Sequence, residues 1–251
     1  MENTSSKDNI VYGIHPIMEA IEAGKEIEKI FIKKDMRGAQ YMELFSMIRQ
    51  NNINYQFVPL ERLNRITRKN HQGIIAYMSA VEYSNLEMII PTIYERGETP
   101  LLLILDGITD VRNFGAICRT AECAGVHAII LPDKGSVLIN SDAVKTSAGA
   151  LQHIPICKVK SLSKTIKYIS QCGINIVACT EKAREFYTNI SYTKPTAIIM
   201  GAEGVGIAPE IFILSQSEAK IPLLGKIESL NVSCATAVIL YEVVRQRQSM
   251  K

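Results

Sequence analysis

The sequence lacks any apolar run long enough to cross a membrane. Its long apolar runs, such as residues 101–105 and 197–200, fall far below the roughly 20 residues that a membrane-spanning helix needs. The six cysteines form no C-x-x-C pair, and the polar N-terminus has no apolar signal-peptide segment. These absences argue against an integral membrane protein and predict a cytoplasmic one.

Several chemical signatures are missing as well. The four histidines are scattered and make no metal-binding spacing such as H-E-x-x-H, so we expect no bound metal. Neither the G-x-S-x-G elbow of many hydrolases nor a Walker loop occurs, which argues against hydrolases and kinases. A net charge of +3 is too small to indicate a nucleic-acid-binding protein by itself.

The pattern that the sequence does contain is that of an α/β protein in two parts. With 251 residues, the chain is long enough for one large domain or two modest ones. The net charge is +2 over residues 1–80, −3 over residues 81–98 and +4 over residues 99–251. We therefore predict a small α/β domain over residues 1–80, a weakly periodic linker over residues 81–98, and a second α/β domain over residues 99–251.

The expected elements differ between the two halves. In residues 10–80, short strands at 30–32, 55–58 and 73–78 alternate with amphipathic helices at 16–23 and 41–49. The second half has nearly continuous apolar strands at 101–106, 127–131, 174–180 and 196–200. Such strands, alternating with helical segments, are typical of a parallel sheet covered on both faces. The last segment predicts a helix over residues 231–248 with Asn231 as its N-cap.

Three polar clusters lie where strands of the second half give way to loops or helices, at residues 113–119, 201–206 and 229–233. Open parallel sheets hold ligands at such positions. The glycines of the second cluster would let the backbone turn sharply and approach a flat ligand, and a carboxylate, Glu203, lies among them. This cluster is not the dinucleotide-binding G-x-G-x-x-G fingerprint, because Pro222 and Leu223 stand where an acidic residue would follow. A dehydrogenase is therefore disfavoured.

The first and third clusters flank helices and also have structural explanations. Asn113 is expected to cap a helix over residues 114–124. On that helix Arg119 lies among small and apolar neighbours and needs a carboxylate or phosphate partner, for which Glu122 offers a purely structural salt bridge. The third cluster holds Ser229, Asn231 and Ser233. These side chains form either a cap or, with free backbone N–H groups, a site for an anion.

Together, the three clusters resemble the motifs of the SpoU/TrmH (SPOUT) family of RNA 2′-O-ribose methyltransferases. The stretches that carry the resemblance are D-x-x-N-x-G-x-x-x-R at 110–119, M-G-A-E-G-x-G at 200–206, and I-P with S-L-N-V-S-x-A at 221–235. Residues 12–16 and 71–74 resemble the substrate-binding domain of the branch that methylates a guanosine in bacterial 23S ribosomal RNA. Val111 departs from the family, which usually has proline there, so this loop should be less rigid.

The resemblance implies a fold, a cofactor and a partner. Residues 99–251 would form a parallel-sheet domain with a deep trefoil knot, and residues 1–80 would form a module similar to ribosomal protein L30e. S-adenosylmethionine would bind in the knot, without a metal, and two copies of the chain would form a homodimer. The residues implied in cofactor binding are Gly201, Ile221 and Leu230 through their backbones, with Thr180, Met200 and Ser229 nearby.

The resemblance also implies catalytic roles for Arg119, Glu203, Asn231 and Asn113. A ribose 2′-OH must lose its proton as it attacks a methyl group, so the site must hold the hydroxyl and accept a proton. Because a guanidinium stays protonated, we expect Arg119 to anchor a phosphate and Glu203 to be the better proton acceptor. Asn231, Asn113 and Ser233 would orient the ribose or Arg119 in a polar pocket.

The predicted reaction is methylation of a guanosine 2′-OH in 23S ribosomal RNA. Candidates for RNA contact are the basic residues Lys33, Lys34, Arg37, Arg65, Arg68, Lys69 and Arg112. Tyr12, Phe57 and Phe114 are candidate stacking residues, and a position in the core explains each of them equally well. Two other hypotheses are compatible with the three motifs. One is a transfer RNA 2′-O-methyltransferase, and the other is a non-catalytic RNA-binding or ribosome-assembly factor with the same fold.

Overall fold

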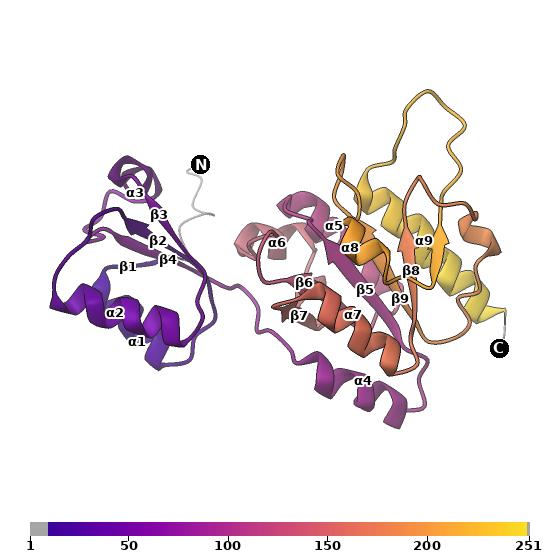
Figure 1. The fold of residues 1–251 in the computed structure, drawn as a ribbon, viewed down its shortest axis with the longest axis horizontal. Helices are drawn as coiled ribbons and strands as arrows, with labels where there is room; N and C mark the ends of the chain where they lie inside the picture. The colour runs from indigo at the N-terminus through magenta and orange to yellow at the C-terminus, as the bar shows by residue number, and fades with distance from the viewer. Residues whose placement is uncertain (1–9, 250–251) are drawn as a thin grey trace. The chain divides into compact units, whose positions relative to one another are not determined.

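The computed structural model describes residues 10–249, which fall into two compact units (Figure 1). The first unit holds the chain up to Glu82 together with the short stretch Leu138–Asp142. The second unit holds Tyr83–Val137 and the chain from Ala143 onward. Each unit has its own sheet and its own hydrophobic core.

The first unit is a four-stranded mixed sheet with helices on both faces. Its strands are β1 (Ile10–Tyr12), β2 (Ile27–Lys33), β3 (Tyr55–Val58) and β4 (Ile74–Met78), in the order β1-β4-β2-β3. Alternation along β2 sends Ile30 and Ile32 to one face and Phe31 to the other. Helices α1 (Ile14–Glu22) and α2 (Ala39–Gln50) cover the first face, and the short helix α3 (Leu60–Ile66) packs on the second.

The two N-terminal stretches that carry the resemblance join each other at one end of this sheet. The Gln72 side chain accepts a hydrogen bond from the backbone N–H of Ile14 at 3.0 Å, which satisfies a free donor at the start of α1. His71 is buried and accepts the N–H of Gly73 through Nδ1 at 3.0 Å, so its Nε2 donates to Asn64 Oδ1 at 2.9 Å. These residues therefore stabilise the fold of the unit.

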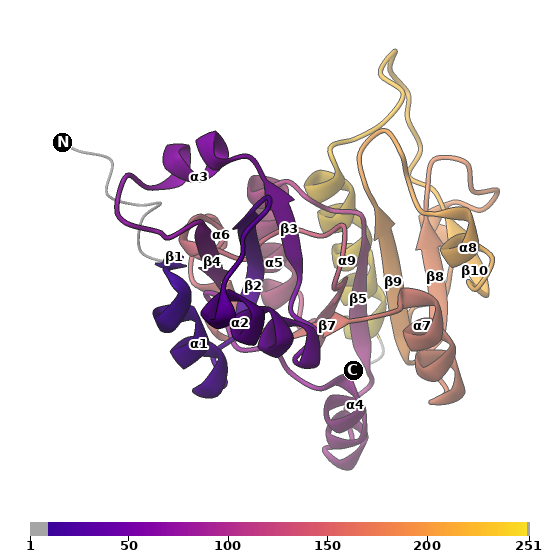
Figure 2. The same ribbon diagram turned by 60° about the vertical axis from the view of Figure 1, so that its left-hand side comes forward.

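The second unit is a six-stranded sheet in which every pair of neighbouring strands is parallel, as the apolar runs predicted. The order is β10-β8-β9-β5-β6-β7, with β8, β9 and β5 side by side in Figure 2. The strands are β5 (Leu101–Asp106), β6 (Ala128–Pro132), β7 (Ile156–Val159), β8 (Asn175–Cys179), β9 (Thr196–Gly201) and β10 (Ser217–Ala219). This confirms an α/β protein with a parallel-sheet C-terminal part, whereas the trefoil knot stays a prediction.

Helices cover both faces of this sheet. Helices α4 (Leu86–Glu95), α7 (Leu162–Gln171) and α8 (Pro209–Phe212) share one core cluster with Leu102 and Ile104 of β5. Because side chains alternate along a strand, the buried Leu101, Leu103 and Leu105 point to the opposite face. Helices α5 (Val111–Cys123) and α9 (Val232–Gln248) pack against each other, and α9 also contacts β9. The remaining short helix, α6, spans Ser141–Thr146.

The stretch 81–98, expected to be a weakly periodic linker, contains helix α4. Leu86, Ile90 and Ile93 recur at helical spacing and are buried in the core of the second unit. Pro91 lies inside the helix and four glutamates lie in or beside it, so the apolar pattern was obscured. The boundaries of separately folding domains stay a prediction.

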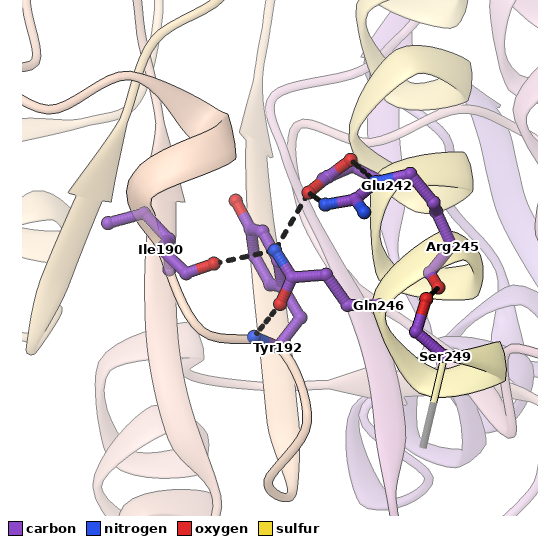
Figure 3. A network of polar contacts seen from close by, with 6 residues as sticks. All are labelled: Ile190, Tyr192, Glu242, Arg245, Gln246 and Ser249. Atoms are coloured by element: carbon purple, nitrogen blue, oxygen red, sulfur yellow. Dashed lines mark hydrogen bonds and ion pairs between the residues drawn. The ribbon is translucent and has the colours of Figure 1, made fainter. Parts of the chain in front are cut away.

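A hydrogen-bond network holds the C-terminal half of α9 in place (Figure 3). Gln246 accepts the N–H of Tyr192 at 2.9 Å and donates to the Ile190 carbonyl at 2.9 Å and to Glu242 at 2.8 Å. Arg245 donates twice to Glu242, at 2.7 and 2.8 Å, and these bonds hold the pKa of that buried carboxyl below its usual value. These bonds therefore fix the C-terminal half of α9. They leave the N-terminus of the helix, at Val232, available for other contacts.

Candidate functional site

The glycine-rich cluster forms a loop that folds back on itself at the end of β9. The Gly206 N–H donates to the Ala202 carbonyl at 2.8 Å, and a Cβ on Gly201 would lie 2.2 Å from the Gly206 carbonyl carbon. Gly204 and Gly206 both have φ of +77°, the left-handed region that glycine adopts freely. The Asp106 carboxylate, from the end of neighbouring β5, accepts the Ala208 N–H at 2.7 Å and closes the loop.

The three polar clusters meet at this loop. Glu203 Oε1 accepts hydrogen bonds from Asn231 Nδ2 at 2.6 Å, from the Val232 N–H at 3.1 Å and from Asn113 Nδ2 at 3.3 Å. Asn231 Nδ2 also donates to Asn113 Oδ1 at 2.9 Å. The Ser233 hydroxyl and N–H both donate to Asn231 Oδ1. Side chains up to 118 positions apart in the sequence therefore form one network.

Asn113 and Asn231 were predicted to be the N-caps of α5 and α9, and the prediction is right only for α9. Asn231 caps α9 as predicted, because its side chain accepts the Ser233 N–H. Asn113 does not cap α5; the helix begins three residues earlier than predicted, at Val111, and Asp110 is the residue whose side chain accepts the Asn113 N–H. The Asn113 side chain is consequently free to join the network around Glu203.

Arg119 lies apart from this network. It is on the same helix as Asn113, six residues or about 9 Å further along the axis, and its side chain is exposed. Within residues 10–249 it forms no hydrogen bond or ion pair, so the alternative of a structural pair with Glu122 is not found. Its charge is therefore available to a ligand.

A pocket of about 280 Å³ opens beside the network, at the C-terminal ends of β8 and β9. All six residues predicted to bind the cofactor line it: Thr180, Met200, Gly201, Ile221, Ser229 and Leu230. Glu203 lines it as well and connects the pocket to the network, whereas Asn113, Arg119 and Asn231 are not among its lining residues. The volume lies near the lower end of the range for small-molecule pockets.

The pocket combines apolar walls with charges of both signs. Met200, Ala219 and Ala235 supply apolar surface, and Glu181, Glu228 and Lys182 supply the charges. Burial raises the pKa of Cys179 to about 12, so this wall residue stays a neutral thiol at physiological pH. The pocket can therefore hold a molecule with apolar parts, a positive centre and a carboxylate.

Sequence reasoning missed the charged lining residues Glu181, Lys182 and Glu228. The first two directly follow β8, whose end lies beside the end of β9 because the strands are parallel. Glu181 and Lys182 could therefore have been predicted to lie near the glycine-rich cluster that follows β9, because the carboxyl ends of neighbouring parallel strands meet at one edge of the sheet. Glu228 lies in the irregular stretch before α9, where the local sequence gives no such indication.

The residues proposed to contact RNA differ in how exposed their side chains are. The seven basic side chains are all exposed, as that role requires. Phe57 is 43% exposed and Tyr12 is partly exposed. Phe114 is fully buried on the face of α5 that packs into the core, so of its two alternatives the core position is confirmed and the stacking role is not.

Over residues 10–249, no group of three or more His, Cys, Asp or Glu side chains could hold a metal ion. None of the helices in the same range has the length and apolar character that crossing a membrane requires.

Two family patterns match the chain. That of the SpoU rRNA methylase family matches residues 100–241, and that of the RNA 2′-O ribose methyltransferase substrate-binding domain matches residues 10–84. The chain is 31% identical over 243 residues to YacO of Bacillus subtilis, which is assigned to the TrmH family of tRNA/rRNA methyltransferases. That alignment covers 97% of this chain and 98% of YacO.

Solved structures of related enzymes share the fold. The AdoMet-bound rRNA methyltransferase of Sinorhizobium meliloti is 26% identical, with a TM-score of 0.60, and covers 96% of this chain and 88% of its own. The TrmH/SpoU tRNA-modifying enzyme of A. aeolicus is 30% identical, with a TM-score of 0.56, and covers 66% of this chain and 85% of its own.

Proposed function

The chain belongs to the SpoU/TrmH family of RNA methyltransferases, and from this we propose that it transfers a methyl group from S-adenosylmethionine to a ribose 2′-OH of RNA. The observation that supports this most is the joining of Glu203, Asn113 and Asn231 into one network at the rim of the pocket. Three stretches far apart in the sequence thus meet where a small molecule and an RNA chain can be brought together.

The pocket residues fit S-adenosylmethionine. Adenine and the methionine chain need apolar surface, which Met200, Ala219 and Ala235 provide. The ammonium and sulfonium charges match the carboxylates of Glu181 and Glu228, and Lys182 matches the ligand carboxylate. When bound, S-adenosylmethionine would supply an activated methyl group, and the protein would orient the attacking hydroxyl and exclude water.

A pocket-filling variant tests this site. Ala235 lines the pocket on α9, whereas the adjacent Cys234 is exposed and is not a lining residue. We expect Ala235→Leu to weaken S-adenosylmethionine binding at least tenfold in isothermal titration calorimetry, and Cys234→Leu to leave it unchanged. Equal affinities in the two variants would place the cofactor elsewhere.

We assign Glu203 a positioning role and Arg119 a catalytic one. Glu203 Oε1 accepts three hydrogen bonds, which fix the amides of Asn113 and Asn231 at the rim of the pocket. Arg119 is exposed, so its guanidinium is available to bind the phosphate next to the target ribose and to stabilise charge in the transition state. Arg119→Ala should then abolish turnover while the affinity for S-adenosylmethionine is retained.

We propose 23S ribosomal RNA, at a guanosine, as the substrate, with transfer RNA as the second candidate. The support is the extent of the likeness: the S. meliloti rRNA enzyme covers 96% of this chain, but the A. aeolicus tRNA enzyme covers only 66%. Labelled methyl transfer to unmodified 23S rRNA and tRNA transcripts in competition would distinguish the two. Such a reaction on ribosomal RNA would take place in the cytoplasm.

We further propose that two copies of the chain pair through the region around the site. Leu224, Ile227 and Val205 are 98%, 76% and 81% exposed, which is costly for large apolar side chains unless a partner covers them. Sedimentation equilibrium should give a dimer for the natural chain and a weaker dimer for Leu224→Lys/Ile227→Lys. A monomer in the first case would contradict the proposal.

A further inference from the structure

The end of strand β5 lies beside the loop of residues 201–208 that follows β9. Asp106 is the last residue of β5 and pairs in register with Gly201, the last residue of β9. Because the two strands are parallel, the chain leaves both of them at the same edge of the sheet. The residues that follow β5 are therefore neighbours of the loop at the edge where the pocket opens.

The tip of this loop gets little support from packing. A Cβ added at Gly204 or Gly206 would meet no atom within 4 Å, and Val205 between them is 81% exposed. Within the loop, one backbone bridge joins Ala202 to Gly206. The position of Glu203 at the tip therefore depends on how firmly the base of the loop is held.

Asp106 holds that base. Its Oδ2 accepts the Ala208 N–H at 2.7 Å, and a hydrogen bond to a carboxylate is stronger than one between neutral groups. The bond closes the loop, since its acceptor lies beside the first loop residue and its donor is the last. Over residues 10–249, no other side chain forms a hydrogen bond with the backbone of this loop.

The residue after Asp106 adds a second contact. Gly107 has φ of +72°, and a Cβ added to it would lie 3.4 Å from the Cβ of Ala202. The backbone at the end of β5 thus packs against the start of the loop, while the Asp106 carboxylate binds its end.

We propose that Asp106 is a positioning residue for methyl transfer, which acts through the loop on Glu203. Asp106 is not a lining residue of the pocket, so it does not act by contact with the cofactor. Glu203 in turn fixes the amides of Asn113 and Asn231. A shift of about 1 Å in groups that orient a substrate can cost about 100-fold in rate. The inference rests on the proposed function, because it concerns the geometry of that reaction.

Two substitutions and a matched control test the role. Asp106→Asn keeps an oxygen that can accept the Ala208 N–H, whereas Asp106→Ala removes it. The control is Gln216→Ala, because Gln216 Oε1 accepts the Ile176 N–H, also at 2.7 Å and in the same unit. Ile176 lies near the start of β8, at the opposite edge of the sheet from the pocket. Urea unfolding would show how much stability each variant loses.

We expect Asp106→Ala to lower kcat about tenfold or more at saturating S-adenosylmethionine, with the KM for RNA changed less than about twofold. Asp106→Asn should keep kcat within about threefold, and Gln216→Ala should keep it within about twofold. Equal losses of kcat in Asp106→Asn and Asp106→Ala, or a kcat of Asp106→Ala as high as that of Gln216→Ala, would overturn the inference.

Hydrogen exchange of the Ala208 amide tests the hold on the loop without any turnover. The amide should exchange about tenfold faster or more in Asp106→Ala than in the natural chain, and at a nearly unchanged rate in Asp106→Asn. An unchanged rate in Asp106→Ala would overturn the inference even if the natural chain methylates RNA. Absence of turnover in the natural chain, by contrast, would be seen before any variant is compared and would contradict the proposed function itself.

Discussion

Glu203 uses one carboxylate oxygen to accept three hydrogen bonds, while over the described residues its other oxygen accepts none. Two of the donors are the side-chain amides of Asn113 and Asn231, and the third is the N–H of Val232 at the start of α9. An arrangement of this kind fixes the position of its donors. It supports the positioning role proposed for Glu203, while the second oxygen leaves its expected role as proton acceptor a prediction.

Two substitutions at Glu203 separate these roles. Glu203→Gln keeps an oxygen that can accept the same three bonds, whereas Glu203→Ala removes it. We expect the Gln variant to keep turnover within about tenfold of the natural chain and the Ala variant to lose about 100-fold or more. The measurement is kcat for methyl transfer at saturating S-adenosylmethionine. Equal losses in both variants would make Glu203 the proton acceptor.

Tyr192 gives a prediction for stability. Its hydroxyl is buried and has no hydrogen-bond partner among the described residues, and burial raises the pKa of the phenol well above its usual value. Removal of an unpaired buried hydroxyl in Tyr192→Phe should raise the free energy of unfolding by about 1 kcal/mol. Urea unfolding at neutral pH measures this, and a loss of similar size would contradict it.

Ionisation of Tyr192 also makes the free energy of unfolding depend on pH. Below about pH 10 the phenol is neutral in both the folded and the unfolded chain. Above that pH it ionises only when unfolded, so the natural chain loses stability as the pH rises. The stability difference between Tyr192→Phe and the natural chain should therefore widen between neutral pH and about pH 11.

At the scale of elements, four of the six strands of the second unit, β5, β6, β8 and β9, were predicted because their apolar runs have no other explanation than burial. Residues 101–106, for example, match β5 without change. Two strands were missed, β7 (Ile156–Val159) and β10 (Ser217–Ala219), because neither is a long apolar run. Both lie at the edges of the sheet, where burial on both faces is less complete. The network between Asn113, Glu203 and Asn231 could be anticipated only through the family resemblance, since periodicity does not report contacts between distant loops.

Arg247 joins three segments of the second unit. Its guanidinium donates to the carbonyls of Tyr192, Lys194, Thr99 and Pro100, so the end of α9 is tied to the start of β5. Arg247→Met would leave these carbonyls without their donor, and we expect a loss of about 2–4 kcal/mol in unfolding free energy. Arg96→Met, at an exposed position at the end of α4, is the control and should change little. Equal stability of the two variants would refute this role.

Gly115 lets α5 approach α6. A Cβ at this position would lie 2.5 Å from the Cβ of Thr146, closer than two carbon atoms can come. Gly115→Ala should therefore lower the free energy of unfolding by about 1–3 kcal/mol through overpacking. Gly225→Ala is the matched control, because its added Cβ would meet no atom within 4 Å. A thermal melt of both variants gives the comparison.

At the scale of the whole molecule, the two units carry different features. The second unit has the pocket and the polar network, and the first has a cavity whose lining includes Arg65, Arg68 and Lys69. The predicted two-part organisation followed from composition and charge, while the cavity was not predicted because its residues come together only through the fold of β1 and α3. The sequence did single out Arg65, Arg68, Lys69 and Tyr12, though without any reason to group them.

The position of the transferred methyl group tests the central claim most directly. RNA methylated by the protein with labelled S-adenosylmethionine would be hydrolysed in alkali, which cleaves a phosphodiester bond only where the neighbouring 2′-OH is free. We predict that the label is recovered in alkali-resistant dinucleotides and that Arg119→Ala gives none. Label in base-methylated mononucleotides, or no transfer to any RNA by a protein that binds S-adenosylmethionine, would contradict the account.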